Sequence, residues 1–232
     1  MALDVIRKEQ GEGDCEVLRC DKEVCRRMNT KIQIGSYNAM QKQPAPTPFC
    51  YDLKRVKAIV LGADPSNFSD NGRSKDLTKA FGIGDGDARY FRSILQNLKE
   101  IGLGLEDVYV DNLIQEYLDS ETSKNRKWDI IANQNILVCL KRLDVIDKKR
   151  KMPILITADI ILKAVISNTA PTRKAKDYYT NPGLVPIKPS QNKLFRPLIP
   201  FFREHHYQLS LHDSYKNILK NILEIVNEHE HG

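Results

Sequence analysis

The stretch AIVLGADPSNFSDNGRSKDLTKAFGI, residues 58–83, begins as an apolar run and continues to an aromatic residue, Phe81. Its first part, AIVLGA, predicts a buried strand, because a strand covered on both faces is a continuous run of apolar and β-branched residues. Asp64 and Pro65 follow directly, where the end of a strand can hold a side chain rigidly. The stretch therefore predicts a sheet with a fixed carboxylate at one edge.

Length and composition are those of a globular protein with a basic surface. The chain has 232 residues, 41% of them hydrophobic, with a net charge of +6 and a pI of about 9.0. This excess suits a polyanionic partner. Basic residues are concentrated at 147–151 and 172–176. These segments are either solvated loops or contacts to phosphates.

The N-terminal residues, the apolar runs and the cysteines indicate the cellular compartment. The first residues are charged where a signal peptide is apolar, and no apolar run is long enough to span a bilayer, so we expect a cytoplasmic protein without membrane contact. Five cysteines are an odd and small number, which argues against a disulfide framework. The expected oligomeric state is a monomer.

Two regions are predicted. Residues 1–53 form an N-terminal extension that ends in a Pro-rich connector at 41–50. In it, Cys15, Cys20 and Cys25 have a spacing that fits neither a zinc site nor an iron–sulfur site, so no metal is expected. Residues 54–232 form a single α/β domain.

Within this domain, strand and helix patterns alternate. The predicted strands are 55–63, 107–114, 152–158 and 183–190, and the predicted helices lie between Asp87 and Gly102 and at 128–146, 159–167 and 213–229. Alternation of this kind predicts a three-layer α/β/α sandwich with a mostly parallel central sheet. Ligands of such sheets bind beyond the carboxyl ends of the strands. The residues expected there are Asp64, Asn112, Ala158 with Asp159, and Lys188 with Ser190.

Each of these residues has an ordinary role and a functional one. Asp64 either caps the next turn or orients water and faces a developing cation. Asn112 is either a turn residue or a reader of an amide or base edge, since it offers a donor beside an acceptor. Phe81, taken alone, is a core residue. Ser190 and its neighbouring amides either belong to a plain loop or hold a phosphate.

The segment after Ser190 also has two interpretations. Leu194 and Phe195 stand between Lys193 and Arg196. Apolar residues between cations could enter a base stack, with the cations on phosphates. They could equally begin a helix with Pro197 in its first turn.

The order of these motifs resembles the uracil-DNA glycosylase superfamily over roughly residues 54–225. Gly62-Ala63-Asp64-Pro65-Ser66-Asn67 is similar to that family's Gly-Gln-Asp-Pro-Tyr-His motif, and KAFGI supplies its Phe as Phe81. The helix pattern FRSILQNLKEIG follows, VYVDNLI supplies an Asn as Asn112, and Lys188-Pro189-Ser190 resembles the final His-Pro-Ser.

The resemblance implies base excision from DNA without metal or cofactor. Phe81 would stack on a flipped base, Asn112 would bind its edge, and Asp64 would position water and favour the cationic sugar. Lys188 would stabilise the leaving base. Gly62, Ala63 and Ser66 would line the pocket, and Ser190, Lys193, Leu194 and Arg196 would contact DNA.

Two departures from the family pattern bear on activity. Ser66 replaces the Tyr that excludes thymine, which would open the pocket and broaden the base preference, and Lys188 replaces the His that faces the departing base. The iron–sulfur cysteines of other branches are missing. The alternatives are a catalytically inactive nucleic-acid-binding module, a lyase with Lys188 as nucleophile, and a small-molecule hydrolase, for which no motif is present.

Overall fold

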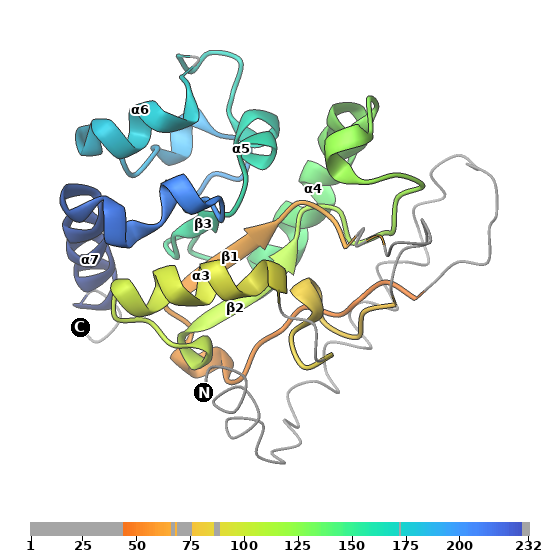
Figure 1. Cartoon of the computed structure of the whole chain (residues 1–232), viewed down its shortest axis with the longest axis horizontal. Helices are drawn as coiled ribbons and strands as arrows, with labels where there is room; N and C mark the ends of the chain where they lie inside the picture. The colour runs from red at the N-terminus through yellow and green to blue at the C-terminus, as the bar shows by residue number, and fades with distance from the viewer. Residues whose placement is uncertain (1–43, 66–67, 69–75, 86–88, 172, 229–232) are drawn as a thin grey trace. The chain divides into compact units, whose positions relative to one another are not determined.

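The computed structural model describes residues 44–232, apart from 66–67, 69–75, 86–88, 172 and 229–232. The chain divides into two units between Pro44 and Ala45, and the second unit, Ala45–Gly232, is compact. All of the helices and strands labelled in Figure 1 belong to the second unit, which begins earlier than residue 54. The predictions for the three N-terminal cysteines and for Ser66 lie outside the described residues.

A parallel sheet forms the centre of the second unit, and the predicted α/β class is confirmed. The strands are β1 (Ala58–Gly62), β2 (Val108–Asn112), β3 (Ile154–Ile156) and β4 (Leu198–Pro200). Their order is β2-β1-β3-β4, and each neighbouring pair is parallel. Because β1 lies inside the sheet with both faces covered, all five of its residues are buried.

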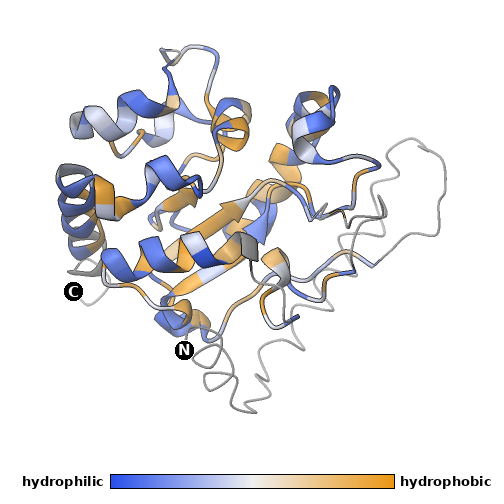
Figure 2. Cartoon of the chain, viewed as in Figure 1, coloured by the Kyte–Doolittle hydropathy of each residue, from blue (hydrophilic) through white to orange (hydrophobic). Residues whose placement is uncertain are grey.

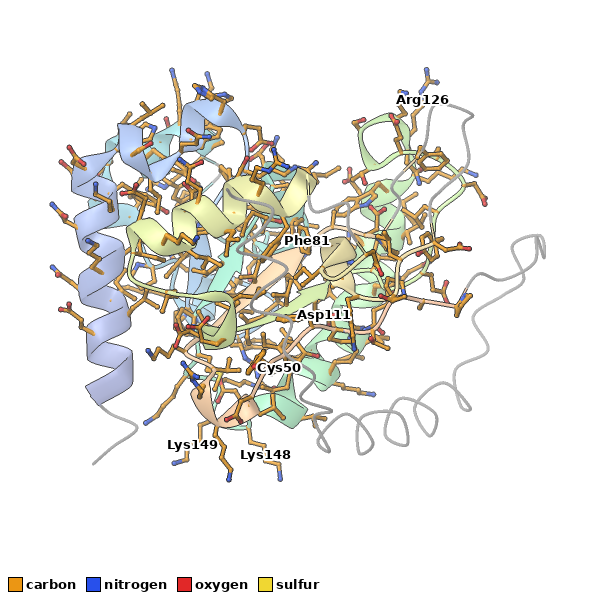
Figure 3. All side chains as sticks on the ribbon, turned by 60° about the horizontal axis from the view of Figure 1, so that its bottom comes forward. Cys50, Phe81, Asp111, Arg126, Lys148 and Lys149 are labelled. Atoms are coloured by element: carbon orange, nitrogen blue, oxygen red, sulfur yellow. The ribbon has the colours of Figure 1, made fainter. Side chains whose placement is uncertain are left out.

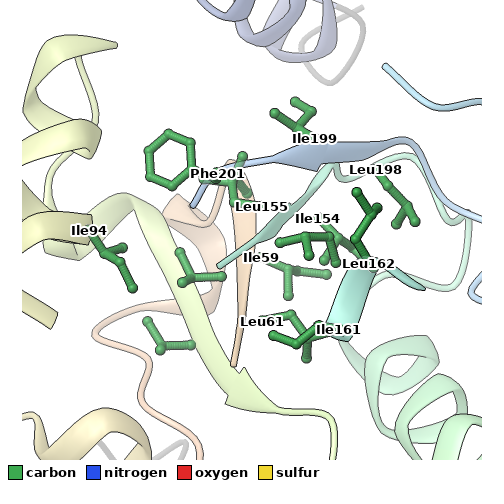
Figure 4. Close-up of a cluster of buried hydrophobic side chains, with 14 of the residues drawn as sticks. Ile59, Leu61, Ile94, Ile154, Leu155, Ile161, Leu162, Leu198, Ile199 and Phe201 are labelled. Atoms are coloured by element: carbon green, nitrogen blue, oxygen red, sulfur yellow. The ribbon is translucent and has the colours of Figure 1, made fainter. Parts of the chain in front are cut away.

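Helices cover both faces of the sheet. They are α3 (Arg89–Glu100), α4 (Trp128–Ile146), α5 (Asp159–Val165), α6 (Ala175–Thr180) and α7 (Asp213–Glu228). Figure 4 shows Ile94 of α3 on one side of the strands, and Ile161 and Leu162 of α5 on the other. In Figure 2 the strands have the apolar colour, while the helices are mixed. None of the described helices combines the length and apolarity needed to cross a membrane.

The end of the Pro-rich connector is part of this unit. Phe49 pairs with Val110 of β2 through two backbone hydrogen bonds of 2.8 Å, one in each direction. Two residues earlier, the carbonyl of Thr47 accepts a hydrogen bond of 2.8 Å from the amide of Ala80. The connector thus covers part of the free edge of β2 and anchors the turn that carries Phe81.

The predicted strand at 183–190 is wrong. Its residues form two short 3₁₀ turns, Pro182–Leu184 and Pro189–Gln191, and Ile187 alone pairs with the sheet, in an antiparallel bridge to Leu198. Each proline lacks the N–H that a strand ladder needs, which explains why no strand forms. The fourth strand is β4 instead, and its Pro200 is tolerated because β4 is the last strand in the order.

Candidate active site at the carboxyl ends of the strands

Three predicted residues meet at the ends of β1 and β2. Gly62 and Asn112 are paired in the parallel register, so the two strands end side by side. A Cβ atom on Gly62 would lie 2.3 Å from Asn112 Oδ1 and 2.5 Å from Phe81 Cζ. The amide of Asn112 and the ring edge of Phe81 therefore rest directly on the Gly62 backbone. Only a glycine permits this approach.

Phe81 is held in an unusual backbone conformation. It lies in the 3₁₀ turn Ala80–Gly82 with φ of 59°, and Gly82 follows with φ of 67°. Few residues other than glycine adopt positive φ, and such strain is concentrated at functional sites. The ring is partly buried and packs against Phe91 with centroids 5.5 Å apart. The turn thus fixes an aromatic ring, part of which remains accessible, beside the amide of Asn112.

The backbone of Asn112 is anchored, whereas its side chain is available. Its N–H donates to Asp111 Oδ1 at 2.7 Å, and its carbonyl accepts from Arg142 Nη2 at 2.7 Å. The residue is 3% exposed. Among the residues that the structure describes, the side-chain amide has no hydrogen-bonding partner. The amide atoms are not fully enclosed, so they can pair with a ligand that offers both a donor and an acceptor.

A buried ion pair beneath Asn112 was not predicted. Arg142 of α4 donates from Nε to Asp111 Oδ2 at 3.0 Å, and the side chains are 9% and 2% exposed. Burial opposes the charge of Arg142, but Asp111 raises its pKa above the ordinary value. The same burial raises the pKa of the neighbouring Cys139 thiol to about 12, so this thiol is neutral at physiological pH. The one sequence signal for this pair is an Asp inside the apolar strand VYVDN.

Asp64 lies just beyond β1 and is held from a distant part of the chain. Its Oδ2 accepts hydrogen bonds from Thr122 Oγ1 at 2.7 Å and from the indole N–H of Trp128 at 2.8 Å. These donors are 58 and 64 residues away, so Asp64 does more than cap its own turn. Neither donor was predicted. Together they fix a carboxylate at the edge where Gly62 and Asn112 end.

Ala63 follows β1 directly, and its place in a base pocket stays a prediction. Its carbonyl accepts a hydrogen bond of 2.9 Å from the amide of Ile114, while that of Gly62 accepts one of 2.8 Å from Leu113. The ladder between β1 and β2 therefore continues past both strands, which makes this part of the edge rigid.

Lys188 does not reach this edge, contrary to the prediction. The bridge between Ile187 and Leu198 places Lys188 opposite Pro197, before β4 begins. At the usual rise and spacing of strands, Lys188 is ~13 Å from Gly62 along the strands and ~14 Å across them. A lysine side chain does not span that separation. The assignment failed because it depended on a strand ending at Ser190.

The residues that follow β4 at the carboxyl edge include Arg203. Its amide donates to the carbonyl of Thr157 at 3.3 Å, and Thr157 donates through N and Oγ1 to Leu61 at 3.2 and 2.9 Å. Arg203 is exposed and lies two strand spacings, ~10 Å, from β1. Arg203, rather than Lys188, is therefore the basic residue that follows β4 at the same edge of the sheet as Gly62.

Two predicted DNA contacts are corrected. Leu194 and Arg196 are both 0% exposed, so neither side chain can contact DNA in this conformation. Arg196 Nη2 instead binds Asp144 at 2.9 Å and the carbonyl of Asp147 at 2.7 Å. The alternative, a helix beginning at this segment, is also wrong, because β4 follows directly.

The other two residues predicted to contact DNA, Lys193 and Ser190, differ in whether their side chains are already bound within the protein. Lys193 Nζ donates to the carbonyl of Ala164 at 2.7 Å and to Asn133 Oδ1 at 2.9 Å, which ties it to neighbouring helices. Ser190 is exposed on its 3₁₀ turn, and its contact to a phosphate stays a prediction.

The basic run at 147–151 lies away from the candidate site. It follows the end of α4, and Figure 3 shows Lys148 and Lys149 projecting together, well separated from Phe81. Arg150 is bound to Asp144 through Nε and Nη2 at 2.9 and 2.8 Å. This run is therefore partly a structural turn, and it adds no charge to the Gly62 edge.

No model of a known protein family matches the chain, and no curated protein sequence is significantly similar to it. Any functional assignment therefore depends on the geometry of the site itself.

Proposed function

We propose that the chain is a DNA glycosylase with a uracil-DNA glycosylase-like fold, which hydrolyses the N-glycosidic bond of a flipped-out uracil or a related damaged base. The observation that carries the proposal is the arrangement over Gly62. An aromatic ring, an unpaired side-chain amide and a fixed carboxylate gather at the ends of two adjacent strands. A flipped base requires such a stacking surface and such an edge-reading group.

Each group has a distinct role in this reaction. Phe81 stacks on the base, while the amide of Asn112 donates to O4 of uracil and accepts from its N3–H. Asp64 orients a water molecule and stabilises the positive charge that develops on the sugar as the bond breaks. The electron pair of that bond leaves with the base, the water oxygen bonds to the sugar carbon, and the proton that this water loses neutralises the base anion. Arg203 supplies a cation to the departing anion.

The proposal is tested by base release from oligonucleotides that contain one uracil, hypoxanthine, xanthine or thymine mismatch. Release of any of these supports it and identifies the base. Binding of the oligonucleotides without release would instead favour the inactive nucleic-acid-binding module on the same fold. Absence of both binding and release would leave neither function standing.

Gly62→Ala is expected to slow base release about 100-fold, a loss typical of reacting groups displaced by about 1 Å. The added Cβ would overlap Asn112 Oδ1 and Phe81 Cζ, so both groups must move. Gly102→Ala is the matched control, since it is strained by a φ of +78° but meets nothing within 4 Å. Single-turnover release and thermal unfolding are measured for both variants. If Gly62→Ala released base as fast as Gly102→Ala and the parent, Gly62 would matter for stability alone.

Arg203→Ala is expected to lower the rate of base release about 100-fold at saturating DNA, because the leaving base loses its cation. Arg203→Lys should recover part of this loss, since it keeps the charge but not the geometry. Arg126→Ala, at an exposed arginine preceding α4, is the control. If Arg203→Ala slows release no more than this control, another group must stabilise the leaving base.

A further inference from the structure

A cavity lies in the long connection between α5 and β4, which the proposed function does not use. Its volume is about 180 Å³. The residues that line it include Ile166, Arg173, Tyr178, Leu184, Lys188 and Gln191. In Figure 1 this connection is the teal to light-blue part of the chain that contains α6. Since Lys188 is remote from Gly62 in the strand register, the cavity is separate from the candidate active site.

The polar side chains of the residues that line the cavity all offer hydrogen-bond donors. Arg173 and Lys188 carry positive charges, and no Asp or Glu occurs among the described residues that line the cavity. Gln191 accepts a hydrogen bond of 3.3 Å from the amide of Lys188 through Oε1, which leaves its NH₂ group to donate. The cavity is therefore electropositive and favours an anion.

Tyr178 points to a ligand independently of these charges. It is 3% exposed, and its hydroxyl has no hydrogen-bonding partner among the described residues. Among the described residues, Arg196 Nε is the one fully enclosed side-chain nitrogen or oxygen that has no hydrogen-bonding partner. The hydroxyl of Tyr178 is therefore not fully enclosed, and Tyr178 is one of the residues that line the cavity.

The hydroxyl of Tyr178 is a donor at neutral pH. Burial raises the pKa of Tyr178, while the charge of Arg173 lowers it in part. Asp159 and Asp177 raise the pKa further from outside the cavity lining. The protonated phenol can therefore donate a hydrogen bond to an acceptor, and the positive charges of the cavity favour an acceptor that is an anion.

We propose that this cavity binds a phosphate group through Arg173, Lys188 and Tyr178. A guanidinium fork, an ammonium and a phenol approach from different parts of the connection, which suits an oxyanion with several acceptor oxygens. At about 30 Å³ for each water, the cavity holds about six waters, or a phosphate group with part of its hydration shell. The phosphate belongs either to a small phosphorylated molecule or to a nucleic-acid strand.

Binding is measured by calorimetric titration of the full chain with inorganic phosphate, pyrophosphate and an undamaged single-stranded oligonucleotide, at constant ionic strength. Tyr178→Phe is expected to weaken phosphate binding about tenfold, as for one lost hydrogen bond to a charged acceptor. Since this hydroxyl has no partner in the described protein, the variant should unfold at the temperature of the parent. Arg173→Gln/Lys188→Gln should abolish binding.

Arg126→Gln/Lys141→Gln removes the same charge from exposed positions before and on α4, and it should bind as the parent does. Binding of inorganic phosphate or pyrophosphate alone would identify a small phosphorylated ligand. Oligonucleotide binding that weakens in the cavity variants would identify a strand phosphate. The proposal is overturned if the parent binds none of the three probes at millimolar concentration, or if cavity and control variants lose binding equally. Base release is not part of this readout, so the two proposals fail separately.

Discussion

Asp64→Asn is expected to release base about 100- to 1000-fold more slowly than the parent chain, the usual loss when a preorganised electrostatic group is removed. The substitution is nearly isosteric. The amide oxygen of Asn can accept the same hydrogen bonds from Thr122 and Trp128 that Asp64 Oδ2 accepts at 2.7 and 2.8 Å. The packing at the strand end is therefore retained, and the change removes the negative charge that faces the developing cation.

The measurement is single-turnover release of the base identified by the oligonucleotide panel, with DNA affinity recorded beside it. Asp129→Asn removes an equal charge from an exposed position on α4 and should not slow release. DNA affinity of Asp64→Asn should equal or exceed that of the parent, since a negative charge near the strand is lost. An unchanged rate would assign Asp64 a purely structural role as the acceptor for Thr122 and Trp128.

The fold was predictable where local pattern and tertiary environment agree. The run AIVLG is β1, VYVDN is β2, and the periodic segment 128–146 is α4. The fourth strand was not predictable in this way. A three-residue edge strand that follows Pro197 and ends at Pro200 has too little pattern to be recognised, whereas GLVPIKPS looks more like a strand than its prolines allow.

The sequence predicted which site residues lie at the strand ends, but it did not predict the residues that hold them in place. Gly62 and Asn112 were placed together because parallel strands end at one edge, and the structure pairs them. The partners that hold this edge come from elsewhere, such as Trp128, 64 residues from Asp64, and Arg142, 31 residues from Asp111. No local pattern encodes such contacts. The Lys188 assignment failed for a related reason, since one misplaced strand moved a cation to the wrong end of the sheet.

Arg142→Met is expected to lower the free energy of unfolding by about 3–5 kcal/mol, the usual cost of leaving one charge of a buried pair without its partner. Asp111 would remain almost fully buried without its guanidinium, and the carbonyl of Asn112 would lose its donor. Urea unfolding can be followed by the fluorescence of Trp128, which is the single tryptophan and is 1% exposed. Arg126→Met, at an exposed arginine, should change stability by less than about 0.5 kcal/mol.

The double variant Asp111→Leu/Arg142→Met separates stability from positioning. Replacing a whole buried pair by apolar residues is often neutral, so this variant should regain most of the stability that Arg142→Met loses. Its base release should nevertheless stay slower than that of the parent, because both backbone groups of Asn112 have lost the partners that orient the residue. Full recovery of both properties would mean that the ladder between β1 and β2 alone positions Asn112. Stability regained without activity would show that the ion pair exists to aim the amide of Asn112 over Gly62.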